Sequence, residues 1–329
     1  MPVAMHTASS SRTLYPELAP YRVHELPVTS GHVLHVEEAG HADGIASLVL
    51  HGGPGSGGSP LLRRFFDPAR YRIVCPDQRG AGKSRPRGST VDNTTDHLMA
   101  DLETVREALG VERWLVVGGS WGAALALAYA AAHPRAVAGL QLRATFLARD
   151  EDITGFFQPA DGEHAEAWAQ FASIAPADQR HALLPFLARE LNRDDDTARH
   201  VAIAWWRWES TLATGTAAQQ PPSGAALDAL VDRYRVQSHY LLHRCWLDAP
   251  PLLDRCAFVP KVPTLSLHGA DDHICQPEAS LAVHSRLPHS RLQIIEGAGH
   301  DPTHPAMVQA TVEALDSYAA DGNFEAVAS

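Results

Sequence analysis

The feature that most constrains this chain is a Gly-x-Ser-x-Gly segment between a short apolar run and a helix of small residues. Residues 118–122 read Gly-Gly-Ser-Trp-Gly, residues 114–117 before them are apolar, and an alanine-rich stretch follows. A serine in a sharp strand-to-helix turn has a strained backbone, and the flanking glycines remove Cβ atoms that would collide there. The segment predicts a nucleophile elbow with Ser120 at its apex, whereas a chance Gly-Ser-Gly turn would lack the flanking strand and helix.

Composition places the chain among globular proteins and excludes several classes of partner. Its 329 residues are 45% hydrophobic and 20% charged, so it can bury a sizeable core. The net charge of −11 comes from 38 acidic residues, scattered along the chain, against 27 Lys and Arg. This balance argues against a nucleic-acid partner and against binding to an anionic membrane surface.

Cysteine usage and hydropathy bear on where the protein works. The four cysteines have no Cys-x-x-Cys spacing, and a low cysteine density is typical of reduced, cytoplasmic proteins. Residues 1–11 lack the apolar core of a signal peptide, and no apolar run reaches the roughly 18 residues of a membrane span. We therefore expect a cytoplasmic protein with neither a signal peptide nor a membrane span.

Strand-like apolar runs alternate with helical periodicity in two parts of the chain, which predicts βαβ units and a mainly parallel sheet flanked by helices. The stretch between the two parts has helical periodicity and little strand character, and predicts an inserted helical cap. The expected division is core 1–145, cap 146–249 and core 250–329. The expected strands are 46–50, 71–75, 114–117, 136–142, 262–268 and 291–296, with an antiparallel hairpin over 21–28 and 32–38. The expected helices of the core are 60–66, 96–109, 123–132, 278–287 and 305–319, and residues 322–329 are expected to fray.

The loop over residues 76–84 ends in Gly-Lys-Ser and resembles a phosphate-binding P-loop at first sight. A P-loop needs a glycine five positions before the glycine of Gly-Lys-Ser, and Asp77 occupies that position. The loop is therefore interpreted as structural, shaping the catalytic edge of the sheet.

Two loops of the second core part carry the expected partners of Ser120. In proteins built around this elbow the acid and then the histidine follow the serine, each on a loop after a strand. The loop 268–273 offers Asp271 and Asp272, and we favour Asp272, the third residue after the glycine. The loop 297–301 offers His300 as general base. The chain has 19 histidines, so residue type alone does not identify the base. His300 is selected because it lies on a loop after a strand and follows the acid in the chain.

An oxyanion hole needs backbone N–H donors beside the developing charge. One comes from the residue after the nucleophile, here Trp121. The glycine-rich loop at 51–58, which follows an apolar strand, offers Gly53 as the second donor, with a purely structural turn as the alternative.

Taken together, the segments 51–55 (His-Gly-Gly-Pro-Gly), 77–80 (Asp-Gln-Arg-Gly) and 118–122, with Asp272 and His300, resemble the prolyl aminopeptidases (proline iminopeptidases). The resemblance implies an α/β-hydrolase fold with a helical cap. It also implies a serine peptidase that removes N-terminal proline from short peptides or amides, without a metal or other cofactor.

The resemblance extends to the cap, where two segments imply substrate-binding residues. The run 205–209 is similar to the family's Trp-x-x-Trp-Glu, which implies that Trp208 lies in the binding region and that Glu209 pairs with the substrate amine. A solvated helical glutamate is the alternative for Glu209. The run 235–240 is similar to Arg-Ile-Glu-Asn-His-Tyr and includes Tyr240, but Gln237 stands where the family has a second glutamate. This substitution halves the negative charge available to an amine.

Two other functions remain open from the sequence. One is an esterase or amidase that acts on a small metabolite with the same triad, a hypothesis that Gln237 favours. The other is a ligand-binding protein without catalysis. That hypothesis gives no reason for the chain to keep a nucleophile, an acid, a base and both oxyanion positions.

Overall fold

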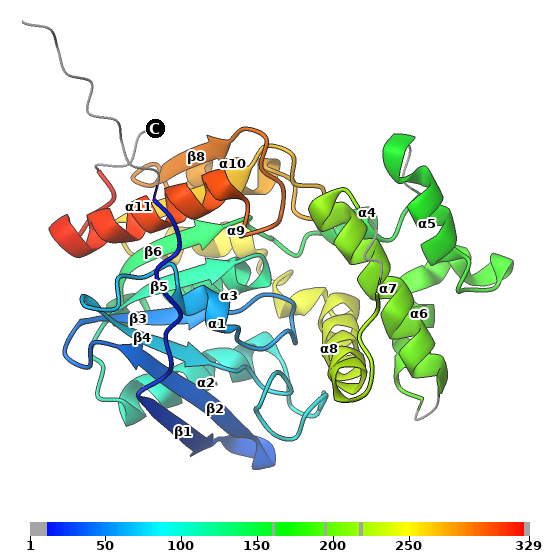
Figure 1. Cartoon of the computed structure of the whole chain (residues 1–329), viewed down its shortest axis with the longest axis horizontal. Coiled ribbons are helices and arrows are strands. Elements are labelled where there is room, and N and C mark those ends of the chain that lie inside the picture. The colour runs from blue at the N-terminus through cyan, green and yellow to red at the C-terminus, as the bar shows by residue number, and fades with distance from the viewer. Residues whose placement is uncertain (1–11, 160–161, 194–195, 217–219, 326–329) are drawn as a thin grey trace, which may run out of the picture.

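An eight-stranded sheet forms the centre of the computed structural model, which describes residues 12–159, 162–193, 196–216 and 220–325 (Figure 1). The strand order is β1-β2-β4-β3-β5-β6-β7-β8. The strands are β1 (Arg22–Pro27), β2 (Val33–Gly40), β3 (Ile45–Leu50), β4 (Tyr71–Pro76), β5 (Trp114–Gly119), β6 (Val137–Arg143), β7 (Thr264–Gly269) and β8 (Arg291–Ile295). From β4 through β8 neighbouring strands are parallel, whereas β1 pairs with β2 and β2 with β4 in antiparallel fashion. The predicted hairpin and the mainly parallel sheet are thus confirmed.

Helices cover both faces of the sheet, as parallel strands require. One face packs against α1 (Pro60–Arg63) and α11 (Pro305–Asp321). The other face packs against α2 (Thr95–Ala108), α3 (Trp121–Ala132), α9 (Leu252–Arg255) and α10 (Glu278–Arg286). The first ten residues of α3 are all buried, which explains why this helix is built almost entirely of alanine and leucine.

A group of helices is inserted between β6 and β7 and lies at one end of the sheet (Figure 1). They are α4 (Asp150–Phe156), α5 (Ala165–Ala172), α6 (Leu183–Leu191), α7 (Asp196–Thr214) and α8 (Ala225–Leu242). Aromatic side chains fill the space between them. Trp205 of α7 stacks on Tyr234 of α8 with ring centroids 4.7 Å apart. These helices lie in the stretch for which the sequence predicts a cap, and the division of the chain into core and cap stays a prediction.

The C-terminal segment is more ordered than the sequence predicts. Phe324 is only 2% exposed and packs on Tyr318 with ring centroids 5.1 Å apart, so the expected fraying does not begin at residue 322. A buried aromatic ring two residues after the helix-ending glycine anchors the chain. Residues 326–329, and the N-terminal residues 1–11, lie outside the described residues.

Among the described residues, no helix has both the length and the apolar character needed to cross a membrane.

Candidate active site

Ser120 lies between β5 and α3 in the conformation expected of an elbow. Its φ of 57° and ψ of −125° are unusual for a residue with a side chain. Its backbone N–H donates to the carbonyl of Arg143 at 2.9 Å. A Cβ at Gly118 would collide with the Gly122 carbonyl, and one at Gly122 would collide with the carbonyl of Leu50. Both glycines are therefore required by close backbone approach.

His300 and Asp272 are hydrogen-bonded to each other, with 2.8 Å between His300 Nδ1 and Asp272 Oδ2. Asp272 is only 2% exposed, whereas the competing Asp271 is exposed to solvent. A carboxylate only accepts hydrogen bonds, so the proton of the neutral imidazole is on Nδ1. Nε2 of His300 is then free to accept a proton.

The carboxylate of Asp272 is held in its ionised form. Its Oδ1 accepts hydrogen bonds at 2.9 Å from the backbone N–H groups of Ile274 and Cys275. Burial alone would raise the pKa of Asp272, but the charge of His300 and hydrogen bonds from His268, His300 and Cys275 hold it well below its ordinary value. An ionised Asp272 can fix the imidazole orientation and stabilise its protonated form.

These groups meet at a cavity of about 240 Å³ between the ends of the strands and the inserted helices. Ser120 and His300 line it from the core, and Glu209 and Gln237 line it from α7 and α8. Most of its accessible lining is apolar, with phenylalanine side chains prominent on the side of the inserted helices; they are Phe146, Phe156 and Phe157. The cavity therefore suits a small substrate group with one polar end.

The expected oxyanion loop is tied to the elbow by a chain of hydrogen bonds. Gly53 lines the cavity with a φ of 115°, a conformation that favours glycine. The backbone N–H of Gln78 donates to His51 Nε2 at 3.0 Å, and Gln78 Oε1 accepts from the indole of Trp121 at 2.9 Å. His51 Nδ1 then donates to the carbonyl of Gly52 at 2.9 Å. Burial lowers the pKa of His51, which keeps it neutral in this role.

The 76–84 loop has a structural role, as the sequence predicts. The carboxylate of Asp77 accepts hydrogen bonds from the backbone N–H groups of Gly58 and Lys83, which joins this loop to the glycine-rich loop. A side chain at Gly82 would collide with the same carboxylate. Asp77, which occupies the position where a P-loop needs glycine, therefore holds two loops together beside the cavity.

Glu209 lies at the cavity but already has two partners. Arg233 Nη2 donates to its Oε1 at 2.7 Å, and the hydroxyl of Tyr234 donates to its Oε2 at 2.6 Å. Burial would lower the pKa of Arg233, but the carboxylate of Glu209 raises it above its ordinary value, so the guanidinium stays charged. Glu209 is not the solvated helical glutamate of the alternative interpretation, but its charge is compensated within the protein.

Gln237 lies beside this ion pair and is 6% exposed. It lines the cavity, and its Oε1 is buried without a hydrogen-bond partner in the described part of the chain. A buried acceptor without a partner costs free energy unless a ligand or water supplies a donor. The side chain thus offers an acceptor to an N–H or O–H group of a bound molecule.

Two residues expected near the substrate lie elsewhere. Trp208 stacks on Phe171 inside the inserted helices, with ring centroids 6.0 Å apart, and its indole donates to the carbonyl of Phe156 at 3.1 Å. Tyr240 packs edge-on against Trp121, and its hydroxyl donates to Asn93 at 2.8 Å. Neither is among the described residues that line the cavity. Both lie on buried faces of their helices, where they pack in the core and do not contact the cavity.

Three residues that line the cavity were not expected from the sequence. Cys275 has its Sγ 3.9 Å from Ser120 Oγ, and burial with the nearby charge of Asp272 raises the pKa of its thiol well above the ordinary value. Arg143 donates to the carbonyl of His300 at 2.9 Å.

The third residue, Arg233, precedes Gln237 by four residues on α8, the spacing that places two side chains on one helix face. That spacing is the signal that could have identified Arg233.

Comparison with known proteins gives a family match and several named relatives. Residues 48–304 match the family described as alpha/beta hydrolase fold. The chain is 39% identical to the proline iminopeptidase of Xanthomonas citri, with 94% of this chain and 100% of that protein covered. It is 36% identical to a probable proline iminopeptidase of Leptolyngbya boryana, covering 94% and 98% of the two chains.

Solved structures show the same fold at lower identity. The proline iminopeptidase-related protein of Thermus thermophilus superimposes with a TM-score of 0.58 at 24% identity, covering 91% of this chain and 97% of that one. VinJ superimposes with a TM-score of 0.63 at 20% identity, covering 92% and 99%.

Proposed function

Because the chain belongs to the proline iminopeptidase family of α/β-hydrolases, we propose that it releases N-terminal proline, or a similar small residue, from short peptides or amides. The observation that carries this proposal is the meeting of Ser120, the His300–Asp272 pair and Glu209 at one small cavity. The proposed reaction is acyl transfer through the serine, with no metal or other cofactor in its steps.

In the proposed mechanism, Ser120 Oγ attacks the substrate carbonyl while Nε2 of His300 takes the hydroxyl proton. The backbone N–H groups of Gly53 and Trp121 stabilise the negative oxygen of the tetrahedral intermediate. His300 then gives its proton to the leaving amine as the C–N bond breaks, which leaves an acyl-enzyme. A water attacks the acyl-enzyme with His300 again as base, and the acid and free Ser120 are released.

The proposed contacts with the acyl group follow from the cavity lining. The apolar walls suit a pyrrolidine ring, and the buried Oε1 of Gln237 would accept a hydrogen bond from the ring nitrogen. Glu209 would be the anionic partner of that amine, in competition with its bond to Arg233. We expect this competition to weaken selection for a charged amine.

The Glu209–Arg233 pair favours a second candidate function, an esterase or amidase whose acyl group is uncharged. A carboxylate and a guanidinium cancel in formal charge, so a neutral group with one hydrogen-bond donor could satisfy Gln237 without displacing Arg233. The same nucleophile and base would serve both substrates.

One experiment separates these functions. Proline arylamide and cyclopentanecarboxylic arylamide have rings of the same size and differ only in the ring nitrogen. We expect kcat/KM to be at least about tenfold higher for the proline compound, the effect of one charged hydrogen bond. Equal values would contradict amine recognition and favour the esterase or amidase. Labelling by a fluorophosphonate, lost in Ser120→Ala, tests the serine mechanism independently; an unlabelled wild-type protein would exclude it.

We further propose that the protein acts in the cytoplasm on small molecules, without a nucleic-acid or membrane partner. The four unpaired cysteines and the acidic balance of the sequence support this proposal.

A further inference from the structure

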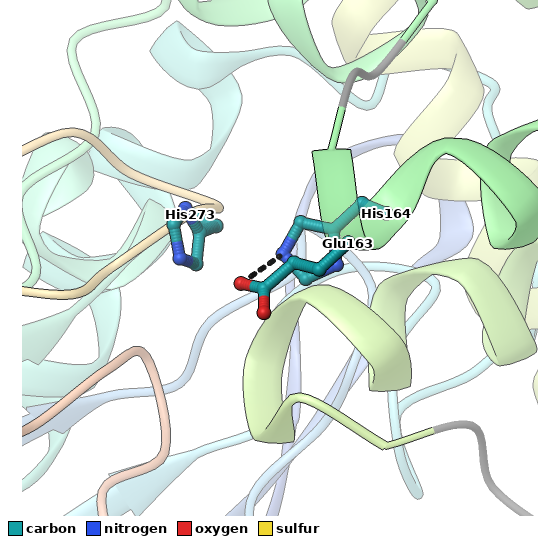
Figure 2. A group of neighbouring side chains, drawn as sticks. All are labelled: Glu163, His164 and His273. Carbon is teal, nitrogen blue, oxygen red and sulfur yellow. Dashed lines mark ion pairs between the residues drawn. The ribbon is translucent and has the colours of Figure 1, made fainter.

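Three side chains of types that can bind a metal lie together outside the cavity, where the inserted helices approach the loop that carries Asp272. Glu163 and His164 belong to the short 3-10 helix Gly162–His164, and His273 directly follows Asp272. Figure 2 shows the carboxylate of Glu163 and the ring of His164 facing His273. One ligand atom from each residue lies within 4.8 Å of the other two. Two segments more than 100 residues apart in the chain therefore contribute to one cluster.

One nitrogen of this cluster is buried without a hydrogen bond among the described residues. His164 Nε2 is shielded from solvent, is 3.7 Å from Glu163 Oε1, and has no hydrogen bond within the described residues. The rings of His164 and His273 are edge-to-face with centroids 5.0 Å apart, and no hydrogen bond joins them among the interactions described. A shielded nitrogen without a partner costs free energy, which a bound cation would recover.

The ligand set selects a class of ion. Two imidazoles and a carboxylate are typical ligands of Zn²⁺ and related transition ions, whereas Mg²⁺ and Ca²⁺ prefer oxygen ligands alone. Zinc bonds of about 2.0–2.2 Å in a tetrahedron place ligand atoms about 3.3 Å apart, so closure requires shifts of about 1–2 Å. The side chain of Glu163 is 80% exposed and His273 is exposed, so both are free to make such shifts.

We propose that Glu163, His164 and His273 bind a zinc-class divalent ion, with water as the fourth ligand. The bound ion slows turnover because it fixes the inserted helices to the loop that carries Asp272, residues 270–277, called here the acid loop. The cavity is walled by both parts, with Ile274 on the acid loop and Phe157 after α4 among its lining. An ion that joins the two parts would hold these walls in one arrangement and slow any exchange of substrate that requires them to separate. The effect on turnover rests on the proposed function, but ion binding does not.

Ion binding is tested by calorimetry with ZnCl₂ on the full chain, and by the visible absorption of added Co²⁺. We expect one Zn²⁺ per chain in the wild type, weakened at least about tenfold by His164→Asn, His273→Asn or Glu163→Gln, since even the outer partners of metal ligands are worth that much. The matched controls are His41→Asn and His289→Asn, which remove exposed imidazoles elsewhere and should leave the affinity unchanged. Equal affinities in cluster variants and controls would overturn the site.

The effect on turnover is tested with an arylamide substrate in the presence of Zn²⁺ or of EDTA. We expect Zn²⁺ to lower kcat/KM of the wild type severalfold and EDTA to restore it, while His273→Asn and Glu163→Gln resist inhibition and match the metal-free wild-type rate. If Zn²⁺ inhibits the wild type and the variants equally, the inhibition comes from binding at Cys275 or His300 in the cavity, and the regulatory role of the Glu163–His164–His273 site is overturned. A chain that binds Zn²⁺ and Co²⁺ as expected but cleaves no arylamide would contradict the proposed function and leave the metal site supported.

Discussion

Arg233 donates a hydrogen bond of 2.7 Å to Glu209, so the carboxylate expected to bind a substrate amine already has a cationic partner inside the protein. Both side chains line the cavity, and they are 24% and 20% exposed. Under the proposed function, selection between charged and neutral substrates depends on a competition between Arg233 and the substrate amine for Glu209.

Replacing Arg233 by methionine should strengthen recognition of a charged amine. Methionine keeps much of the side-chain volume but removes the competing cation, so Glu209 becomes available to the substrate ammonium. We expect the ratio of kcat/KM for proline arylamide over cyclopentanecarboxylic arylamide to rise about tenfold. The control Arg207→Met, on an exposed position of α7, should leave this ratio unchanged. A fall in the ratio would show that Arg233 assists amine binding.

Replacing Glu209 by glutamine should have the opposite effect. The change leaves Arg233 as an uncompensated cation at the cavity, which repels an ammonium. The loss of a sequestered charged hydrogen bond costs about 2–5 kcal/mol, or roughly 30-fold to several-thousand-fold in kcat/KM for proline arylamide. Turnover of a simple aryl acetate, which has no ammonium, should change little. Equal losses on both substrates would mean that Glu209 supports the fold instead of the amine.

Gln237→Glu should raise kcat/KM for proline arylamide and leave the aryl acetate unaffected. A second carboxylate adds negative charge beside the ammonium, and the nearby guanidinium of Arg233 favours ionisation of both acids. Two carboxylates forced together can share a proton, so we expect a gain of severalfold only. The measurement is kcat/KM between pH 6 and 9; an unchanged value on proline arylamide would contradict the proposed contact of residue 237 with the amine.

The geometry of Asp272 predicts how its amide variant behaves. In Asp272→Asn the amide oxygen keeps the two backbone N–H bonds and the amide N–H faces His300 Nδ1, so the imidazole is held in the wrong tautomer. We expect kcat to fall by about 10⁴ with the fold intact by circular dichroism. Asp271→Asn, at the exposed neighbour, should leave kcat within a few-fold of wild type. The reverse ranking would assign the catalytic acid to Asp271.

Glu37 on β2 predicts a pH dependence of stability remote from the cavity. Burial would raise its pKa, but hydrogen bonds from Lys83 and His35 and the charge of Arg63 lower it from 4.5 to about 2. A lowered pKa stabilises the folded state at pH values above that of the unfolded group, and this contribution is lost as pH falls from about 4.5 toward 2. Pairing with Lys83, His35 and Arg63 thus outweighs burial and makes Glu37 a source of stability at neutral pH.

The measurement is the free energy of unfolding in urea for wild type and Glu37→Gln at pH 7 and pH 3.5. We expect a larger difference between the two proteins at pH 7 than at pH 3.5. Glu107→Gln, at a position whose side chain is 72% exposed, is the control and should show little difference at either pH. A difference that stays constant between the two pH values would refute the role of the Glu37 charge.

The sequence predicts the nucleophile, acid and base better than it predicts the substrate contacts. The reason is that the first three can be placed from the strands that precede them, whereas the substrate contacts depend on how helices pack. Ser120 directly follows β5, and Asp272 and His300 lie in the loops after β7 and β8, so strand order alone brings them to one edge of the sheet. The partner of Glu209 lies 24 residues away on another helix, and pairing between helices depends on how they pack. Trp208 and Tyr240 belong to segments that resemble a binding region, but large aromatic side chains on helices also fill cores, and here they do so.

The hydrogen bonds that run from His51 through Gln78 reach Trp121 at the start of α3, next to the turn that carries Ser120. They join the loop after β3, the 76–84 loop and this turn into one unit of three loops around the nucleophile. A substitution in any of these loops therefore disturbs the other two, and a library that varies one of them alone is expected to yield mostly inactive proteins. The helices α7 and α8 present Glu209, Arg233 and Gln237 from outside this unit. New acyl specificities should be sought by diversifying those three positions together, while the three loops keep their wild-type sequence.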